Sequence, residues 1–256
     1  MNSLRNKLAC GKCLSGTLVS LTDPALCEIA GRVGFDCVWI DTEHTYMSYK
    51  EVLCHLNAAR SAGIPSVVRL PQNDLTATKK ILEMGPDGII FPMVKSIEEL
   101  RELIACTLYP PLGTRGFGPM RAIGYGATDA KEYARGESLE LCRFVQIEDA
   151  GLLEKIDELI SMPYVDGYIF GPNDLSGSLG EFLDVSSPKT VSCVRDAARR
   201  LKEGKKTVGI ACGASESALG TWSDIDFDMI FAGADWNYVY DMGRTALSLI
   251  KKHTDK

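Results

Sequence analysis

Short apolar runs alternate with longer amphipathic stretches along the whole chain. Most of the runs are continuous, as in Val38-Trp39-Ile40, which is typical of strands buried on both faces of a parallel sheet. The stretches between them have helical spacing of apolar residues, and several begin with capping residues. The expected strands are residues 16–21, 36–40, 66–70, 88–93, 143–148, 166–171, 207–211 and 228–232. The expected helices are residues 24–33, 48–62, 74–84, 96–108, 151–161, 189–203, 215–221 and 236–252.

Eight strand-and-helix units in 256 residues predict an α/β protein with one domain, residues 1–256, folded as a (β/α)8 TIM barrel. A doubly wound sheet is the alternative, but it usually has fewer strands, and no glycine-rich dinucleotide motif follows the first strand. Ser96 and Glu99 predict a capping box at the start of the fourth helix.

The alternation of expected strands and helices is interrupted at residues 109–142. A structureless loop of that length is uncommon inside a compact domain, so we expect a short helix within it at residues 129–135. Its Gly/Pro-rich part either reaches a functional site or a neighbouring subunit, or is a plain surface excursion.

Composition narrows the class of protein. The chain is 45% hydrophobic and 24% charged, as in ordinary globular proteins, and its formal net charge of −6 argues against a nucleic-acid partner. No apolar run approaches the roughly 20 residues of a membrane span, and the first residues do not have the pattern of a signal peptide. The nine cysteines lie mostly in apolar segments, which predicts a reduced, cytoplasmic protein. Cys10 and Cys13 have no second pair to complete a zinc site.

Polar side chains follow the apolar runs at the ends of four expected strands. In chain order they are Asp41, Glu43 and His44, then Arg69, then Gln146 and Glu148, then Asn173 and Asp174. A parallel barrel gathers the carboxyl ends of its strands at one mouth, where its chemistry takes place. An acid beside a histidine can orient the ring and raise its basicity, so His44 is a candidate general base with Asp41 as its partner. Taken alone, the motif is equally compatible with a histidine that caps a helix or lies in a loop.

The remaining polar residues predict a metal and a carboxylate site. Glu148 and Asp174 offer the oxygen ligands that suit a hard divalent ion such as Mg²⁺, with Mn²⁺ or Co²⁺ as alternatives. Asp174 could instead be a helix N-cap. Arg69 offers a fixed fork for a carboxylate or a developing enolate. The tight turn that begins at Gly171 presents the backbone N–H groups of Asn173 and Asp174, which can cradle a carboxylate.

Together these groups predict proton chemistry next to the carbonyl of a small 2-oxo acid. No expected strand interior carries a lysine for a Schiff base, and only Lys95 lies near the predicted mouth.

Six motifs, in order along nearly the whole chain, carry a family resemblance. They are Ile40-Asp-Thr-Glu-His44, Val68-Arg69, Phe91-Pro-Met-Val94, Tyr109-Pro-Pro-Leu-Gly-Thr-Arg-Gly116, Val145-Gln-Ile-Glu148 and Gly171-Pro-Asn-Asp-Leu-Ser176. They resemble the metal-dependent (class II) 2-oxo-acid aldolases, which include the 4-hydroxy-2-oxoheptanedioate and 2-dehydro-3-deoxyglucarate aldolases. The resemblance implies a barrel lyase that reversibly cleaves a 4-hydroxy-2-oxo acid to pyruvate and an aldehyde through a metal-stabilised pyruvate enolate.

The resemblance also implies a role for each matching residue. His44 is the base, working through a metal-bound water and supported by Asp41, and Arg69 steadies the enolate. The implied metal ligands are Glu148 and Asp174, and the implied pyruvate contacts are Gln146 with the backbone that follows Gly171, at Asn173 and Asp174.

The same resemblance implies a homohexamer in which the last helix, residues 236–252, is swapped between paired subunits. Glu83 stands where the family often has an aspartate that reaches a neighbour's histidine. The segments 180–188 and 211–214 depart from the family, and we expect them to recognise the aldehyde.

Two other functions use the same groups. A CoA-thioester lyase or citrate-synthase-like condensing enzyme shares the metal–enolate chemistry, and would need a basic groove for the CoA phosphates that Arg115 and Arg121 could form. A non-catalytic protein that binds a 2-oxo acid and a metal is the third possibility.

Overall fold

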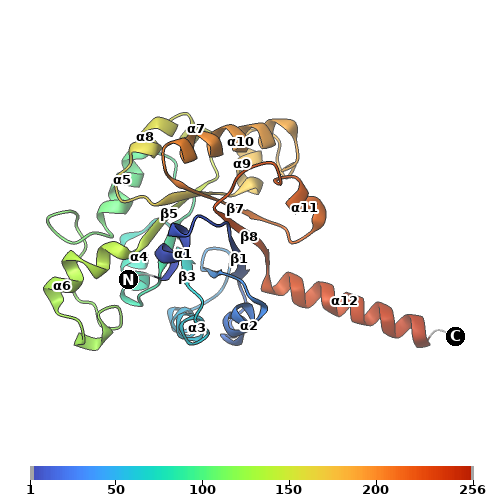
Figure 1. Cartoon of the computed structure of the whole chain (residues 1–256), viewed down its shortest axis with the longest axis horizontal. Helices are drawn as coiled ribbons and strands as arrows, with labels where there is room; N and C mark the ends of the chain where they lie inside the picture. Colours follow the sequence, from blue (N-terminus) through green and yellow to red (C-terminus); the bar gives the residue numbers. More distant parts are fainter. Residues whose placement is uncertain (1–2, 255–256) are drawn as a thin grey trace.

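Eight parallel strands close into a barrel in the computed structural model, which describes residues 3–254 (Figure 1). Each strand pairs with the next along the chain, and the first pairs with the last. This confirms the predicted (β/α)8 fold. The strands are β1 (Leu14–Val19), β2 (Cys37–Asp41), β3 (Ser66–Arg69), β4 (Gly88–Phe91), β5 (Cys142–Ile147), β6 (Gly167–Phe170), β7 (Thr207–Cys212) and β8 (Met229–Ala234).

Helices surround the barrel, and the last helix extends away from it (Figure 1). The helices are α1 (Ser3–Ala9), α2 (Ala25–Val33), α3 (Tyr49–Ser61), α4 (Leu75–Glu83), α5 (Ile97–Ala105), α6 (Ala130–Arg135), α7 (Ala150–Leu153), α8 (Ile156–Ser161), α9 (Pro172–Ser178), α10 (Pro188–Glu203), α11 (Glu216–Gly220) and α12 (Asp235–Thr254). Two 3₁₀ turns complete them, η1 (Gly124–Gly126) and η2 (Glu137–Glu140). Within residues 3–254, no helix is long and apolar enough to cross a membrane.

Every residue of the strands β2 to β6 is buried, as the continuous apolar runs indicate. In β2, Trp39 packs inside the barrel in a cluster with Phe144 of β5 and Phe231 of β8, whereas Val38 and Ile40 pack outwards beneath the helices. The rings of Trp39 and Phe231 meet edge to face, with centroids 5.1 Å apart. Leu4 of α1 belongs to the interior cluster, so α1 adds to the packed core of the barrel.

Side chains alternate between the two faces of each strand, so the residues that follow the interior apolar residues at a spacing of two also point into the barrel, and these are polar. Residues two apart point to the same face, so Asp41 follows Trp39, and Gln146 and Glu148 follow Phe144, on the inner side of the barrel. Arg69 follows Val67 in the same way on β3. The packed core therefore ends in a layer of charged and amide groups at the carboxyl ends of the strands.

Several helices differ from the sequence-based expectations. The expected helix 151–161 is two helices, α7 and α8, because the backbone leaves helical geometry at Lys155. The expected capping box at Ser96 forms only in part: its hydroxyl accepts from the N–H of Glu99, but the Glu99 carboxylate accepts from the N–H of Lys95. A complete capping box forms at Ser48, the residue before α3.

The segment 109–142 contains the expected short helix, α6, whose N-cap is Asp129. It also contains η1, η2 and a small cluster of buried residues around Tyr109, Ile123 and Tyr133. Arg121 anchors the segment by donating to the backbone carbonyl of Met84 at the end of α4. The segment therefore packs as an ordered layer against α4.

Candidate active site

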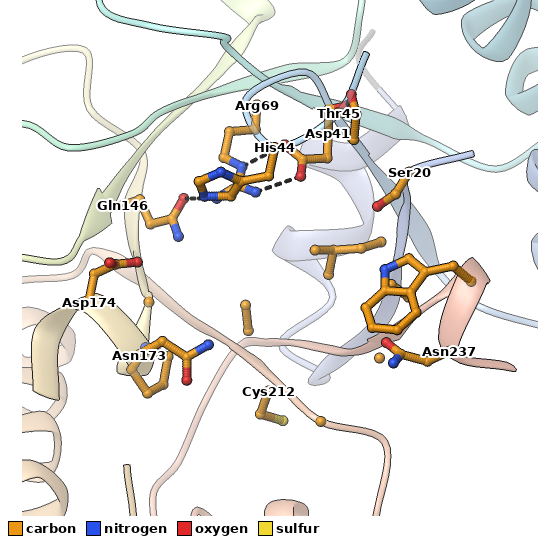
Figure 2. A pocket seen from close by; sticks show the side chains of 18 of the residues that line it. Ser20, Asp41, His44, Thr45, Arg69, Gln146, Asn173, Asp174, Cys212 and Asn237 are labelled. Atoms are coloured by element: carbon orange, nitrogen blue, oxygen red, sulfur yellow. Dashed lines mark hydrogen bonds and ion pairs between the residues drawn. The ribbon is translucent and has the colours of Figure 1, made fainter. Parts of the chain in front are cut away.

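A cavity of about 740 Å³ lies at the mouth formed by the carboxyl ends of the strands (Figure 2). Its size is typical of small-molecule sites. The predicted site residues that line it are Asp41, His44, Arg69, Gln146, Glu148, Gly171, Asn173 and Asp174. Among the described residues that line it there is no lysine, and Lys95 is exposed outside it. The structure thus brings together every predicted site residue except Glu83.

Arg69 is the centre of the polar network in this cavity. Its Nε and Nη2 donate to the two carboxylate oxygens of Asp41 at 2.9 and 2.6 Å, and its Nη1 donates to Oε1 of Gln146 at 3.4 Å (Figure 2). The guanidinium carbon lies 5.2 Å from the centre of the ring of Trp39, which belongs to the cluster inside the barrel. Arg69 is 5% exposed. A planar fork held by a bidentate carboxylate and an aromatic face is fixed in direction.

Asp41 therefore holds Arg69, although the sequence predicted it as the partner of His44. Parallel register places Asp41 beside Arg69 on the neighbouring strand, and both side chains point inwards. The acid that approaches the histidine is Glu43, whose Oε2 lies 3.7 Å from Nε2 of His44 and 2.9 Å from Nη1 of Arg69. Burial raises the pKa of Glu43, while the charge of Arg69 opposes that rise. Glu43, left without a role by the sequence, connects His44 to Arg69.

Glu148 is the most strongly perturbed acid of the cavity. It is 4% exposed, and one of its oxygens accepts from the backbone N–H of Met93 at 2.8 Å. Burial raises its pKa to about 7, the Met93 N–H opposes the rise, and the charges of Glu43 and Asp174 add to it. A buried carboxylate among other acids is an environment that a cation stabilises.

Asp174 lies in the first turn of α9, and the N-cap of that helix is Gly171, without a side-chain hydrogen bond. Asp174 is thus not the N-cap, and its carboxylate is free to face the cavity (Figure 2). The sequence predicted only a tight turn here. Pro172 at the first helical position is the signal that could have revealed α9.

Gly171 is required by close approach. A Cβ at this position would lie 2.8 Å from both Nε2 of Gln146 and Cγ of Glu148, so a side chain would displace both groups. We expect Gly171→Ala to lower kcat/KM for the reaction catalysed in this cavity about 100-fold, since a shift of about 1 Å in a positioned group has that effect. The melting temperature should change little. Gly220→Ala is the control because nothing lies within 4 Å of its Cβ position. Wild-type kinetics for Gly171→Ala would show that Gln146 and Glu148 need no fixed placement.

Glu83 lies outside this cavity. It ends α4 and pairs with Arg115, whose Nη2 is 3.1 Å from Oε1 of Glu83 and whose guanidinium stacks on Tyr109. Arg121 donates to Asn57 and to Met84. Neither arginine lines this cavity.

Residues 14–215 match the HpcH/HpaI aldolase/citrate lyase family. The chain belongs to this family. Relatives in the family include a hydroxypyruvate/pyruvate aldolase of Deinococcus radiodurans, which is 32% identical over 250 residues that cover 98% of this chain and 90% of the relative. A 2-keto-3-deoxy-L-rhamnonate aldolase of Klebsiella pneumoniae subsp. pneumoniae is 30% identical over 210 residues, covering 81% and 78%.

Solved structures agree with this assignment. The HpcH/HpaI aldolase from Desulfitobacterium hafniense DCB-2 superposes with a TM-score of 0.89 at 28% identity, covering 97% of this chain and 96% of that one. Membership of the HpcH/HpaI family confirms the predicted resemblance and the prediction of a carbon–carbon lyase.

Proposed function

We propose that the protein is a divalent-metal-dependent aldolase that reversibly cleaves a 4-hydroxy-2-oxo acid to pyruvate and an aldehyde. The observation that carries this proposal is the placement, in one cavity, of a fixed guanidinium at Arg69 and two carboxylates at Glu148 and Asp174. The names of the relatives as pyruvate and 2-keto-3-deoxy acid aldolases support the reaction class.

The donor set fits a hard divalent ion. Glu148 and Asp174 are oxygen ligands, and Mg²⁺ commonly takes one or two carboxylates and completes its octahedron with water and substrate. Burial raises the pKa of Glu148 to about 7 although the charge of Arg69 opposes that rise, and a bound cation would favour the charged form of this carboxyl group. When bound, the ion supplies positive charge for the carboxylate and keto oxygens of the 2-oxo acid.

The remaining residues bind and orient the substrate and move the proton. Arg69, held by Asp41, donates to the oxygen on which negative charge develops, and Gln146 positions the same end of the substrate. The N–H groups of Asn173 and Asp174 at the start of α9 hold the carboxylate. His44, beside Glu43, takes the proton from the C4 hydroxyl in the cleavage direction and returns a proton to C3 of the enolate, which gives pyruvate.

Proton exchange tests this function without an aldehyde. In D₂O, the protein with Mg²⁺ and pyruvate is expected to exchange the methyl protons of pyruvate, which proton NMR follows directly. EDTA should stop the exchange, and borohydride should trap no adduct. Pyruvate that keeps its protons would refute enolate formation, and a trapped adduct would identify a lysine-dependent enzyme instead.

We further propose that the protein is an oligomer, a hexamer by the family resemblance, in which α12 docks on a second copy of the chain. The helix extends away from the barrel (Figure 1) and exposes many of its large apolar side chains. Those with more than half of their surface exposed are Trp236, Val239, Tyr240, Met242, Leu247, Leu249 and Ile250. An apolar surface of this kind on a folded protein marks an interaction site. In such an assembly Glu83 would approach the His44 of a neighbouring subunit.

Ile250→Glu is expected to dissociate this assembly, because it places a charge in the middle of a buried apolar contact. Size-exclusion chromatography with light scattering should show a mass near that of the 27.9 kDa chain or of a smaller assembly. Ser248→Glu, which adds the same charge at a polar position of α12, should keep the wild-type mass. A wild-type protein that is already monomeric would refute the assembly.

A further inference from the structure

The cavity has a second wall, built from the ends of β1, β7 and β8 and from the start of α12. Its members include Leu18, Ser20, Cys212, Gly213, Trp236 and Asn237. Ser20 and Asn237 lie across the cavity from Gln146 and Asp174 (Figure 2). The opposite side of the cavity, here called the first wall, is formed by Arg69, Gln146, Glu148, Asn173 and Asp174. A substrate held at the first wall by its 2-oxo acid end therefore extends its other end towards Ser20 and Asn237.

This second wall carries no charge among the described residues. All the acidic and basic side chains that line the cavity are on β2, β3 or α9, or directly follow β2 or β5: Asp41, His44, Arg69, Glu148 and Asp174. The aldehyde that reacts with pyruvate is here called the acceptor. An acceptor that carries a carboxylate or a phosphate would meet no cation at the second wall, and an unpaired charge there is costly.

Asp235, the first residue of α12, lies behind the second wall and does not line the cavity. It is 5% exposed, and its Oδ2 accepts from the backbone N–H groups of Ser20 and Leu21, both at 2.9 Å. Its Oδ1 accepts from the N–H of Trp236 at 2.8 Å. Three N–H donors satisfy this carboxylate, which joins the end of β1 to the start of α12 and holds the wall in place.

The wall does offer two free hydrogen-bonding side chains. The hydroxyl of Ser20 has no partner in the part of the chain that the structure describes, nor has the amide of Asn237, and both residues are half-buried. Around them lie apolar surfaces, including the indoles of Trp222 and Trp236. Hydroxyl and amide groups beside aromatic faces suit a ligand with alternating C–H and O–H groups.

We propose that the second substrate is an uncharged hydroxyaldehyde whose hydroxyl groups bond to Ser20 and Asn237. This assignment rests on the proposed aldolase function and specifies its acceptor. In the cleavage direction the C3–C4 bond breaks, its electron pair stays on the pyruvate carbon, and the C4 hydroxyl loses its proton as the aldehyde forms. The enolate then takes up one proton, so no oxidant or reductant is needed.

Matched aldehydes test the acceptor with the metal-loaded protein and pyruvate, and mass spectrometry measures the products. Glycolaldehyde should exceed acetaldehyde, and glyceraldehyde should exceed propionaldehyde, in kcat/KM by about tenfold for each hydrogen bond gained. Succinic semialdehyde and glyceraldehyde 3-phosphate should be slower than glyceraldehyde by about 100-fold. A preference for either anionic aldehyde would overturn the proposal, as would equal rates within the matched pairs.

Variants assign the preference to the two side chains. Ser20→Ala removes only a hydroxyl, and Asn237→Leu keeps a similar volume. Each should lower the ratio of kcat/KM for a hydroxylated aldehyde to kcat/KM for its deoxy counterpart by about tenfold. Asn237→Arg should raise the rate with succinic semialdehyde. Asn6→Leu, on the exposed surface of α1, is the matched control and should keep the ratio. An unchanged ratio in both Ser20→Ala and Asn237→Leu would remove these residues from the acceptor site.

Proton exchange separates the two levels of the proposal. A wild-type protein that exchanges pyruvate protons but prefers an anionic aldehyde keeps the aldolase function and loses the acceptor assignment. A protein without exchange loses both.

Discussion

Glu148→Gln is expected to abolish binding of Mg²⁺ or Mn²⁺ and to lower turnover about 1000-fold, since a metal contributes several kcal/mol to stabilising the charge that develops in the reaction. Glutamine keeps the size of the side chain and removes only the charge. One of its side-chain groups can still occupy the place of the oxygen that accepts from Met93. Calorimetric titration with the metal and the rate of pyruvate exchange measure the two effects.

The same variant has a second, independent signature in the metal-free protein. The folded-state pKa of Glu148 is raised to about 7, above the ordinary value of a glutamate. The contribution of Glu148 to the free energy of unfolding is therefore fully present below the ordinary pKa of a glutamate. It is lost as the pH rises from there through about 7, by roughly 3 kcal/mol in total. In EDTA, urea unfolding of the wild-type protein should give a lower free energy at pH 8 than at pH 5. Glu148→Gln should lack this loss.

Glu154→Gln is the control, because Glu154 is exposed at the end of α7. It should bind metal and lose stability with pH as the wild-type protein does. Unchanged metal affinity in Glu148→Gln would place the ion elsewhere, whatever the pH dependence of stability.

The barrel and the contents of its mouth were predictable because they depend on local patterns. Continuous apolar runs such as Val38-Trp39-Ile40 identify buried parallel strands, and the fold itself then brings the ends of β2, β3, β5 and β6 together. The period of two places Gln146 and Glu148 on the same inner face as Phe144. No knowledge of side-chain contacts is needed for these steps.

The pairing of charges within the mouth could not be predicted in the same way. The motif Asp41-Thr42-Glu43-His44 shows which residues are neighbours along the chain, whereas the partner of Asp41 lies on β3. Strand register decides that contact, and a motif on one strand does not reveal its register with the neighbouring strand. The role of Glu43 depends on the path of the loop after β2, which the hydrogen bond from its N–H to Asp41 shapes.

The outer elements show the limits of periodicity. α7, α8 and α9 are each of seven residues or fewer, too short to display a helical repeat. The wall of Ser20 and Asn237 was also missed, because these side chains have no charged or metal-ligating chemistry of their own. The second wall became informative only when the structure showed that, unlike the first wall, it carries no charged side chain among the described residues.

His44→Ala is expected to slow pyruvate exchange by about 10² to 10⁴-fold, the usual contribution of a positioned general base, while metal affinity stays unchanged. The reason is the division of roles in the cavity. In the proposed function Glu148 and Asp174 supply the oxygen ligands, whereas His44 lies near Glu43 and has a largely exposed side chain, 66%. The measurements are exchange by NMR and metal binding by calorimetry on the same preparation.

Two companions make this result specific. His253→Ala removes an exposed histidine from the last turn of α12 and should exchange at the wild-type rate. Asp41→Asn should raise the KM for pyruvate more than it lowers kcat, because Asp41 acts by holding Arg69. Loss of the metal in His44→Ala would make His44 a ligand, and exchange at the wild-type rate would assign the base to another group. If Asp41→Asn reproduces the kinetics of His44→Ala, then Asp41 supports the base, as the sequence first indicated, and the contact with Arg69 is secondary.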